Sequence, residues 1–218
     1  LKVEKAGYTT AKVAISGYEL TQDVKLDSVV GGIGRSAGCG KDLGSLKAGN
    51  NPLKIQSGAY QRDYTINIPN NYDKNKAHRL IFTWHWINAS DDAVVNGQVS
   101  PGGGANWAYF GLKRMADSAG VPVVFIAPSS RTGMWGQEDH VLFDDLLKLY
   151  KTNLCIDTAR VFATGFSFGA MQTYSLSTGK KQHLRAVATL AAANFNIWLP
   201  TYQSNLNIAY LGITGMSD

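Results

Sequence analysis

From about residue 60 onward, short apolar runs typical of buried strands alternate with longer runs that have helical periodicity. Strands that alternate with helices of about ten to fifteen residues pair in parallel, because each helix returns the chain to the starting edge. The pattern predicts a mostly parallel central sheet flanked by helices on both faces. The expected strands are Arg62–Ile68, Arg79–Trp84, Val123–Ala127, Arg160–Thr164, Leu184–Leu190 and Asn207–Thr214.

Three helices are expected between these strands, at Trp107–Ala119, Asp139–Leu154 and Phe168–Thr178. Asp139 is predicted to cap the second one. The first 34 residues differ, because apolar and polar residues alternate there as in antiparallel strands, and the glycine-rich stretch GGIGRSAGCG follows. We therefore expect a β-rich extension over residues 1–34 and an α/β domain over residues 35–218.

Composition narrows the functional classes. Hydrophobic residues make up 44% of the chain and charged residues 17%, as in an ordinary globular domain. The net charge of +5 is scattered rather than gathered in a stripe, so no nucleic-acid partner is expected. No apolar run approaches the roughly 20 residues of a membrane span, so no membrane partner is expected. The first residues lack the apolar segment of a signal peptide, which fits a mature secreted form or an intracellular protein.

The cysteines and glycines indicate neither a metal nor a dinucleotide. Cys39 and Cys155 match no metal-ligand spacing and no redox motif, so two buried thiols and one long-range disulfide both remain open. The run GGIG lacks the GxGxxG spacing and the following helix of a dinucleotide site. No cofactor and no metal are therefore expected.

The motif that carries chemistry is Gly165-Phe166-Ser167-Phe168-Gly169, which fits GxSxG. It lies where an expected strand meets an expected helix, as a nucleophile elbow requires. In that geometry the Ser167 hydroxyl stands above the sheet, and the Phe168 N–H at the helix start faces a developing oxyanion. A glycine-rich turn without catalytic function is the alternative. The motif in this context predicts an α/β-hydrolase fold with Ser167 as nucleophile.

Chain order in this fold runs from serine to acid to histidine. Asp218 follows the last expected strand and stands where the acid belongs, although a solvated terminal aspartate is the alternative. No histidine follows it; the four present are His78, His85, His140 and His183. We therefore expect no histidine of this chain within hydrogen-bond reach of Ser167. We also expect the domain to be C-terminally incomplete, without the last strand and helix of the fold, so that residues 207–214 form a sheet edge that a second chain could cover.

Weaker candidates lie near the expected carboxyl edge of the sheet. His85 ends a strand, and the N–H of Trp86, or of Ile87, is predicted to be the second oxyanion donor; a histidine that only braces this loop is the alternative. Trp135 and Trp107 lie on or near loops where an aromatic acid could stack, with core packing as the alternative. Asn88-Ala89-Ser90 is a glycosylation sequon, which matters only in a secreted protein.

Longer stretches add a family resemblance. SAGCGK, IPNNYD, RLIFTWHW followed by VVNG, GQED, NLCID, ATGFSFGAM and YLGITGMSD cover most of the region from Ser36 to Asp218. This region resembles the fungal feruloyl esterases of carbohydrate esterase family one, which are related to polyhydroxybutyrate depolymerases.

The resemblance implies a secreted enzyme that cleaves hydroxycinnamoyl esters, such as ferulate, from the arabinose side chains of xylan. It implies Ser167 and Asp218 as triad members, a triad histidine further along than Asp218, and a disulfide between Cys39 and Cys155. Alternatives are an acetylxylan esterase or polyester depolymerase with the same machinery, and a non-catalytic carbohydrate-binding protein on a hydrolase fold.

Overall fold

A computed structural model describes residues 13–15, 18–20, 34–99, 105–193, 196–201 and 207–215. The chain divides into two units, Leu1–Gly32 and Ile33–Asp218. In the first unit, β1 (Val13–Ile15) and β2 (Tyr18–Leu20) pair as antiparallel strands, as their alternating pattern predicts. The other strand residues expected up to residue 30 lie outside the described residues.

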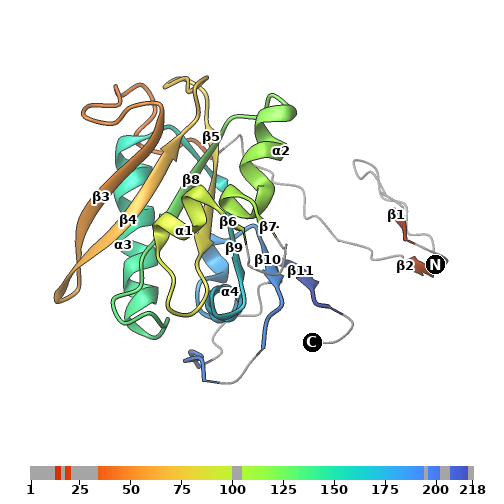
Figure 1. Ribbon diagram of the computed structural model, residues 1–218. Coiled ribbons are helices and arrows are strands. Elements are labelled where there is room, and N and C mark those ends of the chain that lie inside the picture. Colours follow the sequence, from red (N-terminus) through yellow and green to blue (C-terminus); the bar gives the residue numbers. More distant parts are fainter. Residues whose placement is uncertain are drawn as a thin grey trace. The chain divides into compact units, whose positions relative to one another are not determined.

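The second unit contains a seven-stranded sheet in the order β11-β10-β9-β5-β8-β4-β3 (Figure 1). From β8 to β11 neighbouring strands run parallel, whereas β4 and β3 join the other side as an antiparallel pair. The predicted mostly parallel sheet is therefore confirmed, but β3 was not predicted. The strands are β3 (Gly49–Ser57), β4 (Tyr60–Ile68), β5 (His78–Trp84), β8 (Val123–Pro128), β9 (Ile156–Phe166), β10 (Ala186–Leu190) and β11 (Ala209–Ile213).

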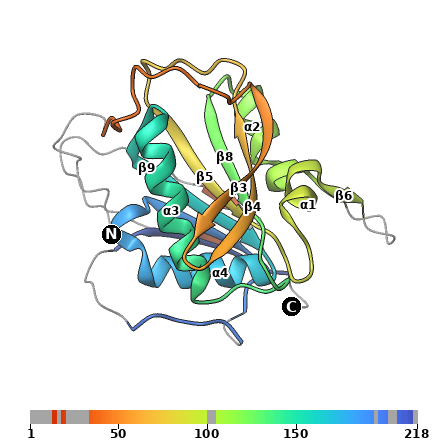
Figure 2. The same ribbon diagram turned by 90° about the vertical axis from the view of Figure 1, so that its left-hand side faces the viewer.

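Helices cover both faces of this sheet, as Figure 2 shows. The α-helices are α1 (Asp91–Asn96), α2 (Leu112–Ser118), α3 (Glu138–Asn153) and α4 (Phe168–Gly179). The described part of this unit also contains two 3-10 turns, η1 (Ala108–Gly111) and η2 (Lys181–His183), and a short ladder of β6 (Gln98–Val99) with β7 (Ala105–Asn106). Among the described residues, none of these helices has both the length and the apolar character needed to cross a membrane.

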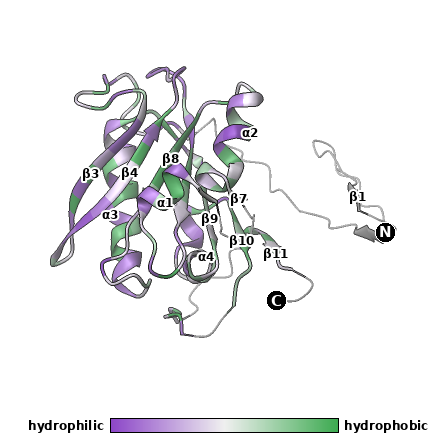
Figure 3. Ribbon diagram, in the orientation of Figure 1, coloured by the Kyte–Doolittle hydropathy of each residue, from purple (hydrophilic) through white to green (hydrophobic). Residues whose placement is uncertain are grey.

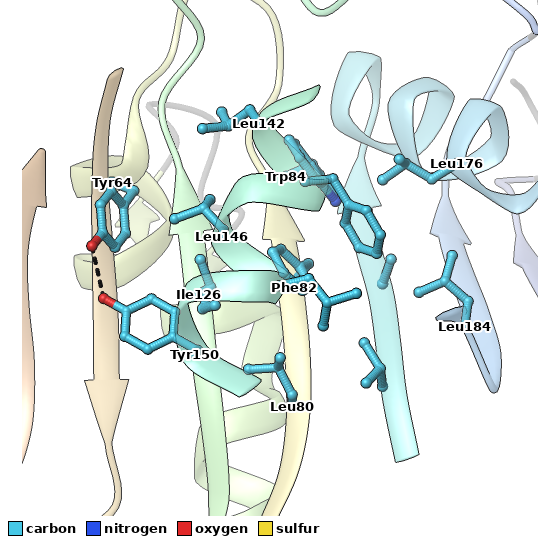
Figure 4. Packing of buried hydrophobic residues seen from close by; sticks show 14 of the residues in the cluster. Tyr64, Leu80, Phe82, Trp84, Ile126, Leu142, Leu146, Tyr150, Leu176 and Leu184 are labelled. Atoms are coloured by element: carbon cyan, nitrogen blue, oxygen red, sulfur yellow. Dashed lines mark hydrogen bonds between the residues drawn. The ribbon is translucent and has the colours of Figure 1, made fainter. Parts of the chain in front are cut away.

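The alternation of side chains along β8 divides the core into two layers. Val124 and Ile126 belong to the larger cluster, which packs under α3 and α4, while Phe125 belongs to the cluster under α1 and α2. Most of the strand is hydrophobic in Figure 3, because both of its faces are covered. Figure 4 shows the larger cluster, in which the hydroxyls of Tyr64 and Tyr150 form a hydrogen bond of 2.7 Å.

The helix expected at Trp107–Ala119 is shorter than predicted. Tyr109 and Phe110 have φ angles of 53° and 55°, so the chain makes a left-handed turn there and α2 begins only at Leu112. The Tyr109 ring is buried against Phe125 and explains the turn, because its hydroxyl also donates to Asn50 Oδ1 at 2.8 Å. Met115 has the helical spacing of the apolar residues Leu112 and Ala119, yet it is 68% exposed.

The capping function predicted for Asp139 is wrong. Gln137 is the N-cap of α3, and Asp139 lies in the first turn with a fully buried carboxylate. Arg62 of β4 decides this, because its guanidinium donates to Asp139 Oδ1 at 2.5 Å and to the Ser129 carbonyl at 3.0 Å. The second carboxylate oxygen of Asp139 accepts from the Gly136 N–H at 2.6 Å. The buried pair therefore connects β4, the loop after β8 and the start of α3.

Cys39 and Cys155 form the expected disulfide across a sequence separation of 116 residues. Ser36 reinforces this junction, because its hydroxyl donates to the Leu154 carbonyl at 2.5 Å and accepts from the Ile156 N–H at 2.8 Å. The segment before the first core strand is thus attached to the residues that connect α3 to β9.

Replacing Cys39 and Cys155 together by serine should lower the free energy of unfolding by roughly 3 to 5 kcal/mol, because the bond restricts the unfolded chain over a long loop. Equilibrium urea unfolding measures this difference. Thiol titration of the denatured, unreduced protein should find no free cysteine. Two titratable thiols, or equal stability of the variant, would contradict the prediction.

Candidate active site

Ser167 occupies a strained turn between β9 and α4. Its backbone has φ 53° and ψ −120°, a conformation that costs a non-glycine residue on the order of 1 to 3 kcal/mol and that clusters at active sites. Two hydrogen bonds hold it there: the Ser167 N–H donates to the Leu190 carbonyl of β10 at 2.9 Å, and its carbonyl accepts from Met171 of α4 at 3.0 Å. Ser167 is half-buried at this turn.

The two glycines of the motif are required by close backbone packing. A Cβ atom on Gly165 would lie 2.3 Å from the Gly169 carbonyl oxygen. A Cβ atom on Gly169 would lie 2.0 Å from the carbonyl oxygen of Trp84 and 2.6 Å from that of His85. The second residue of α4 therefore lies directly against the end of β5, which no side chain would allow.

This contact brings two backbone donors to the same edge of the sheet. Phe168 is the first residue of α4, so its N–H has no acceptor within the helix. Trp86 follows β5, and in the described part of the chain neither its N–H nor that of Phe168 has a hydrogen-bond acceptor. The Trp86 ring meets the Phe166 ring edge-on at a centroid distance of 6.2 Å. The structure thus gathers Ser167, Phe168 and Trp86, three of the residues that the sequence singled out.

Two histidines lie at the wrong edge of the sheet to act on Ser167. His78 begins β5 and His183 comes just before β10, whereas Ser167 follows the carboxyl end of β9, and these strands are parallel. Both ring nitrogens of His78 are engaged, with the Cys155 carbonyl and the Asp73 N–H, each at 3.3 Å.

The other two histidines are buried and engaged elsewhere. His85 contacts the Trp86 carbonyl at 2.6 Å and accepts from the Ser130 N–H at 3.0 Å. His140 Nε2 lies 2.8 Å from Ser175 Oγ, and the Ser175 hydroxyl donates to a backbone carbonyl at 2.6 Å, so the imidazole is the donor in this pair. Burial lowers the pKa of both His85 and His140 to about 4. Among the described hydrogen bonds, none joins any of the four histidines to Ser167.

The remaining predicted residues have different outcomes. Trp135 is only 4% exposed and its ring packs against Trp84 and His85, so the structure does not support its predicted substrate contact and favours the packing alternative. Trp107 is 57% exposed, with the Arg114 guanidinium 4.7 Å from its ring centroid, and its substrate contact stays a prediction. Asp218 lies outside the described residues, so its assignment also stays a prediction.

Sequence reasoning missed the turn that follows His85. The Ala89 N–H donates to the Trp86 carbonyl at 3.2 Å, and Asn88, with φ 57°, donates its N–H to the Gly133 carbonyl at 2.8 Å. Asparagine tolerates this left-handed conformation better than most residues, which was the available signal. No comparable signal pointed to Gly133. In the described residues, no group of three or more His, Cys, Asp or Glu side chains gathers as metal ligands would.

No family model matches the chain. Over 187 residues, or 84% of its length, the chain is 35% identical to a probable feruloyl esterase C from Aspergillus flavus. This chain is a homologue of the fungal feruloyl esterases. The alignment covers 62% of the Aspergillus protein, so this chain spans less than two thirds of that relative's length.

Solved structures establish the fold of this feruloyl esterase homologue. A mutant of the feruloyl esterase module from Clostridium thermocellum, complexed with sinapinate, superposes with a TM-score of 0.55 at 10% identity, covering 67% of this chain and 54% of that one. An acetyl xylan esterase from Aspergillus awamori gives 0.54 at 15% identity, covering 73% and 58%. The predicted α/β-hydrolase fold is confirmed.

Gly169→Ala should destabilise the protein by more than the roughly 1 to 3 kcal/mol typical of overpacking, because the added methyl group would collide with the Trp84 carbonyl. Gly136→Ala is the matched control, since nothing lies within 4 Å of a Cβ atom built there. Urea unfolding of both variants checks this. Equal stability of the two variants would contradict the packing argument.

The buried histidines should make the protein sensitive to acid. His85 and His140 have folded pKa values of about 4, against an ordinary value of 6.5, so between these pH values the unfolded chain binds protons that the folded chain does not. The free energy of unfolding should therefore fall as the pH is lowered through this window, by up to about 1.4 kcal/mol per pH unit for each histidine. Urea unfolding at several pH values measures the slope. His140→Gln should make it shallower, and an unchanged slope would contradict the assignment.

Proposed function

We propose that this protein is a secreted serine carboxylesterase that hydrolyses feruloyl esters of plant cell-wall arabinoxylan. The observation that carries the proposal is the strained backbone of Ser167, at a strand-to-helix turn where two N–H groups lack acceptors among the described residues. The name of the Aspergillus relative supports the choice of acyl group.

In the proposed reaction, Ser167 Oγ attacks the ester carbonyl carbon and loses its proton to an imidazole. The carbonyl oxygen becomes negative and accepts hydrogen bonds from the N–H groups of Phe168 and Trp86. The ester C–O bond then breaks, and the sugar hydroxyl leaves with the proton from the imidazole. Water attacks the acyl-enzyme by the same sequence and releases the acid.

The proposal assigns Asp218 as the carboxylate that orients this imidazole. The imidazole itself is a separate requirement, because the ring contacts described above engage His78, His85 and His140 elsewhere, and His183 lies at the opposite edge of the sheet. The function therefore needs an imidazole that none of these four supplies.

Exposed apolar side chains beside the nucleophile fit an aromatic acyl group. Phe166 is 42% exposed and precedes Ser167, and its ring meets that of Trp86. Ile87, 46% exposed, lies on the turn that carries the second proposed oxyanion donor. We assign these three side chains to the ferulate ring. The disulfide supports the extracellular location, since such bonds persist in oxidising compartments.

Ser167→Ala in the full-length protein should reduce kcat for methyl ferulate by on the order of 10⁴-fold to 10⁶-fold, because the nucleophile is lost. Ser177→Ala is the matched control: Ser177 lies on the same helix, is buried, and its hydroxyl donates only to the Tyr174 carbonyl among the described bonds. This control should retain activity.

Comparing methyl ferulate with p-nitrophenyl acetate tests the acyl group. A higher kcat/KM for the acetyl ester would favour the acetylxylan esterase or polyester depolymerase alternative. No turnover of either ester, together with no labelling of Ser167 by a fluorophosphonate, would favour a non-catalytic protein. Activity of Ser167→Ala near that of the parent would refute the nucleophile.

A further inference from the structure

Two consecutive carbonyl groups after β5 are held by aromatic ring donors. The His85 carbonyl accepts from the Trp135 indole N–H at 2.7 Å. The next carbonyl, that of Trp86, accepts from the His85 ring at 2.6 Å and from the Ala89 N–H at 3.2 Å. Both rings belong to buried side chains, so both carbonyl groups are tied toward the interior.

The partners of His85 determine which of its ring nitrogens carries the proton. A carbonyl oxygen only accepts, so Nδ1 must donate to Trp86. A backbone N–H only donates, so Nε2 must be the unprotonated acceptor for Ser130. The ring is therefore neutral with its proton on Nδ1, in agreement with the low pKa that burial produces.

Fixing a carbonyl also fixes the N–H on the same peptide. A trans peptide is planar, and its N–H points opposite to its C=O. The Trp135 bond therefore turns the Trp86 N–H away from the core, and the His85 bond does the same to the Ile87 N–H. The close contact of Gly169 with the Trp84 and His85 carbonyls places this turn beside the start of α4.

We propose that His85 and Trp135 are positioning residues for ester hydrolysis, whose ring N–H groups hold two consecutive peptides so that the N–H groups of Trp86 and Ile87 face the side of Ser167. This inference rests on the proposed function and deepens it. Neither ring touches the substrate. Trp135, which the sequence associated with substrate stacking, acts instead through the backbone of the turn.

The chain offers a matched control for each residue. Trp84 lies in the same core with its ring centroid 4.9 Å from that of Trp135, and its indole N–H is buried without a partner. His78, at the opposite end of β5, repeats the bonding pattern of His85, with Nδ1 against a carbonyl and Nε2 accepting from a backbone N–H. Each control loses the same kind of side chain from a similar buried setting.

The kinetic test compares Trp135→Phe with Trp84→Phe, and His85→Phe with His78→Phe, in the full-length protein acting on methyl ferulate. Loss of one oxyanion donor costs about 10²-fold to 10³-fold in kcat. A displaced donor should cost less, so we expect kcat to fall about 10-fold to 100-fold in the two positioning variants, with KM within about two-fold. The controls should keep kcat within about two-fold of the parent value, even where their melting temperatures fall as much as those of the positioning variants.

Amide hydrogen exchange across residues 86–90 provides a readout that needs no activity. The Asn88 and Ala89 amides donate to the carbonyl groups of Gly133 and Trp86. Their exchange rates should rise in both positioning variants and stay unchanged in the controls. A kcat loss no larger than in the matched control, or unchanged exchange, would overturn the inference. Ester hydrolysis absent from the parent protein would refute the proposed function, and exchange would still decide whether these rings hold the turn.

Discussion

The geometry of the candidate active site depends on one close backbone contact, between Gly169 at the start of α4 and the last peptide of β5. A Cβ atom at Gly169 would meet the Trp84 carbonyl at 2.0 Å, so strand and helix approach as nearly as two main chains can. This approach forces the turn at Ser167 into a positive φ angle. It also places the free N–H at the start of α4 beside the turn after β5. The positions of the proposed nucleophile and of the proposed oxyanion donors are therefore consequences of one packing constraint.

Buried polar groups fix the loops at the rest of the carboxyl edge of the sheet. Arg62 and Asp139 connect β4 with the start of α3, and the loop between β8 and α3 supplies Trp135 and Ser130 to His85. These bonds matter because an unsatisfied buried donor or acceptor costs about 1 to 3 kcal/mol. Among the described residues, only Nε of Arg62 and the hydroxyl of Ser130 are left without a partner in this group. The hydrophobic layers hold the sheet and helices together, whereas these polar bonds fix the loops above them.

Local signals were sufficient for the strands of the large sheet except β3, for α3 and α4, and for the elbow. Periodicity and the spacing of GxSxG depend on neighbouring residues, and the elbow needs only a strand before it and a helix after it. The environments of individual side chains were harder to predict. Trp135 was considered for substrate contact but is buried, and Met115 is 68% exposed despite its helical apolar spacing, because burial depends on which distant element covers a residue. Asp139 is of a residue type that often caps helices, but Arg62, 77 residues earlier, binds its carboxylate.

The α/β alternation, the position of the proposed nucleophile and the resemblance to feruloyl esterases could all be predicted from the sequence, because each depends on contiguous residues. The reason why each histidine is excluded from Ser167 depends instead on the folded arrangement. Strand direction puts His78 and His183 at the opposite edge, and hydrogen-bond polarity engages His85 and His140 with other partners. These outcomes depend on which donors meet which acceptors in the folded chain. Residue order alone does not specify which of them form hydrogen bonds.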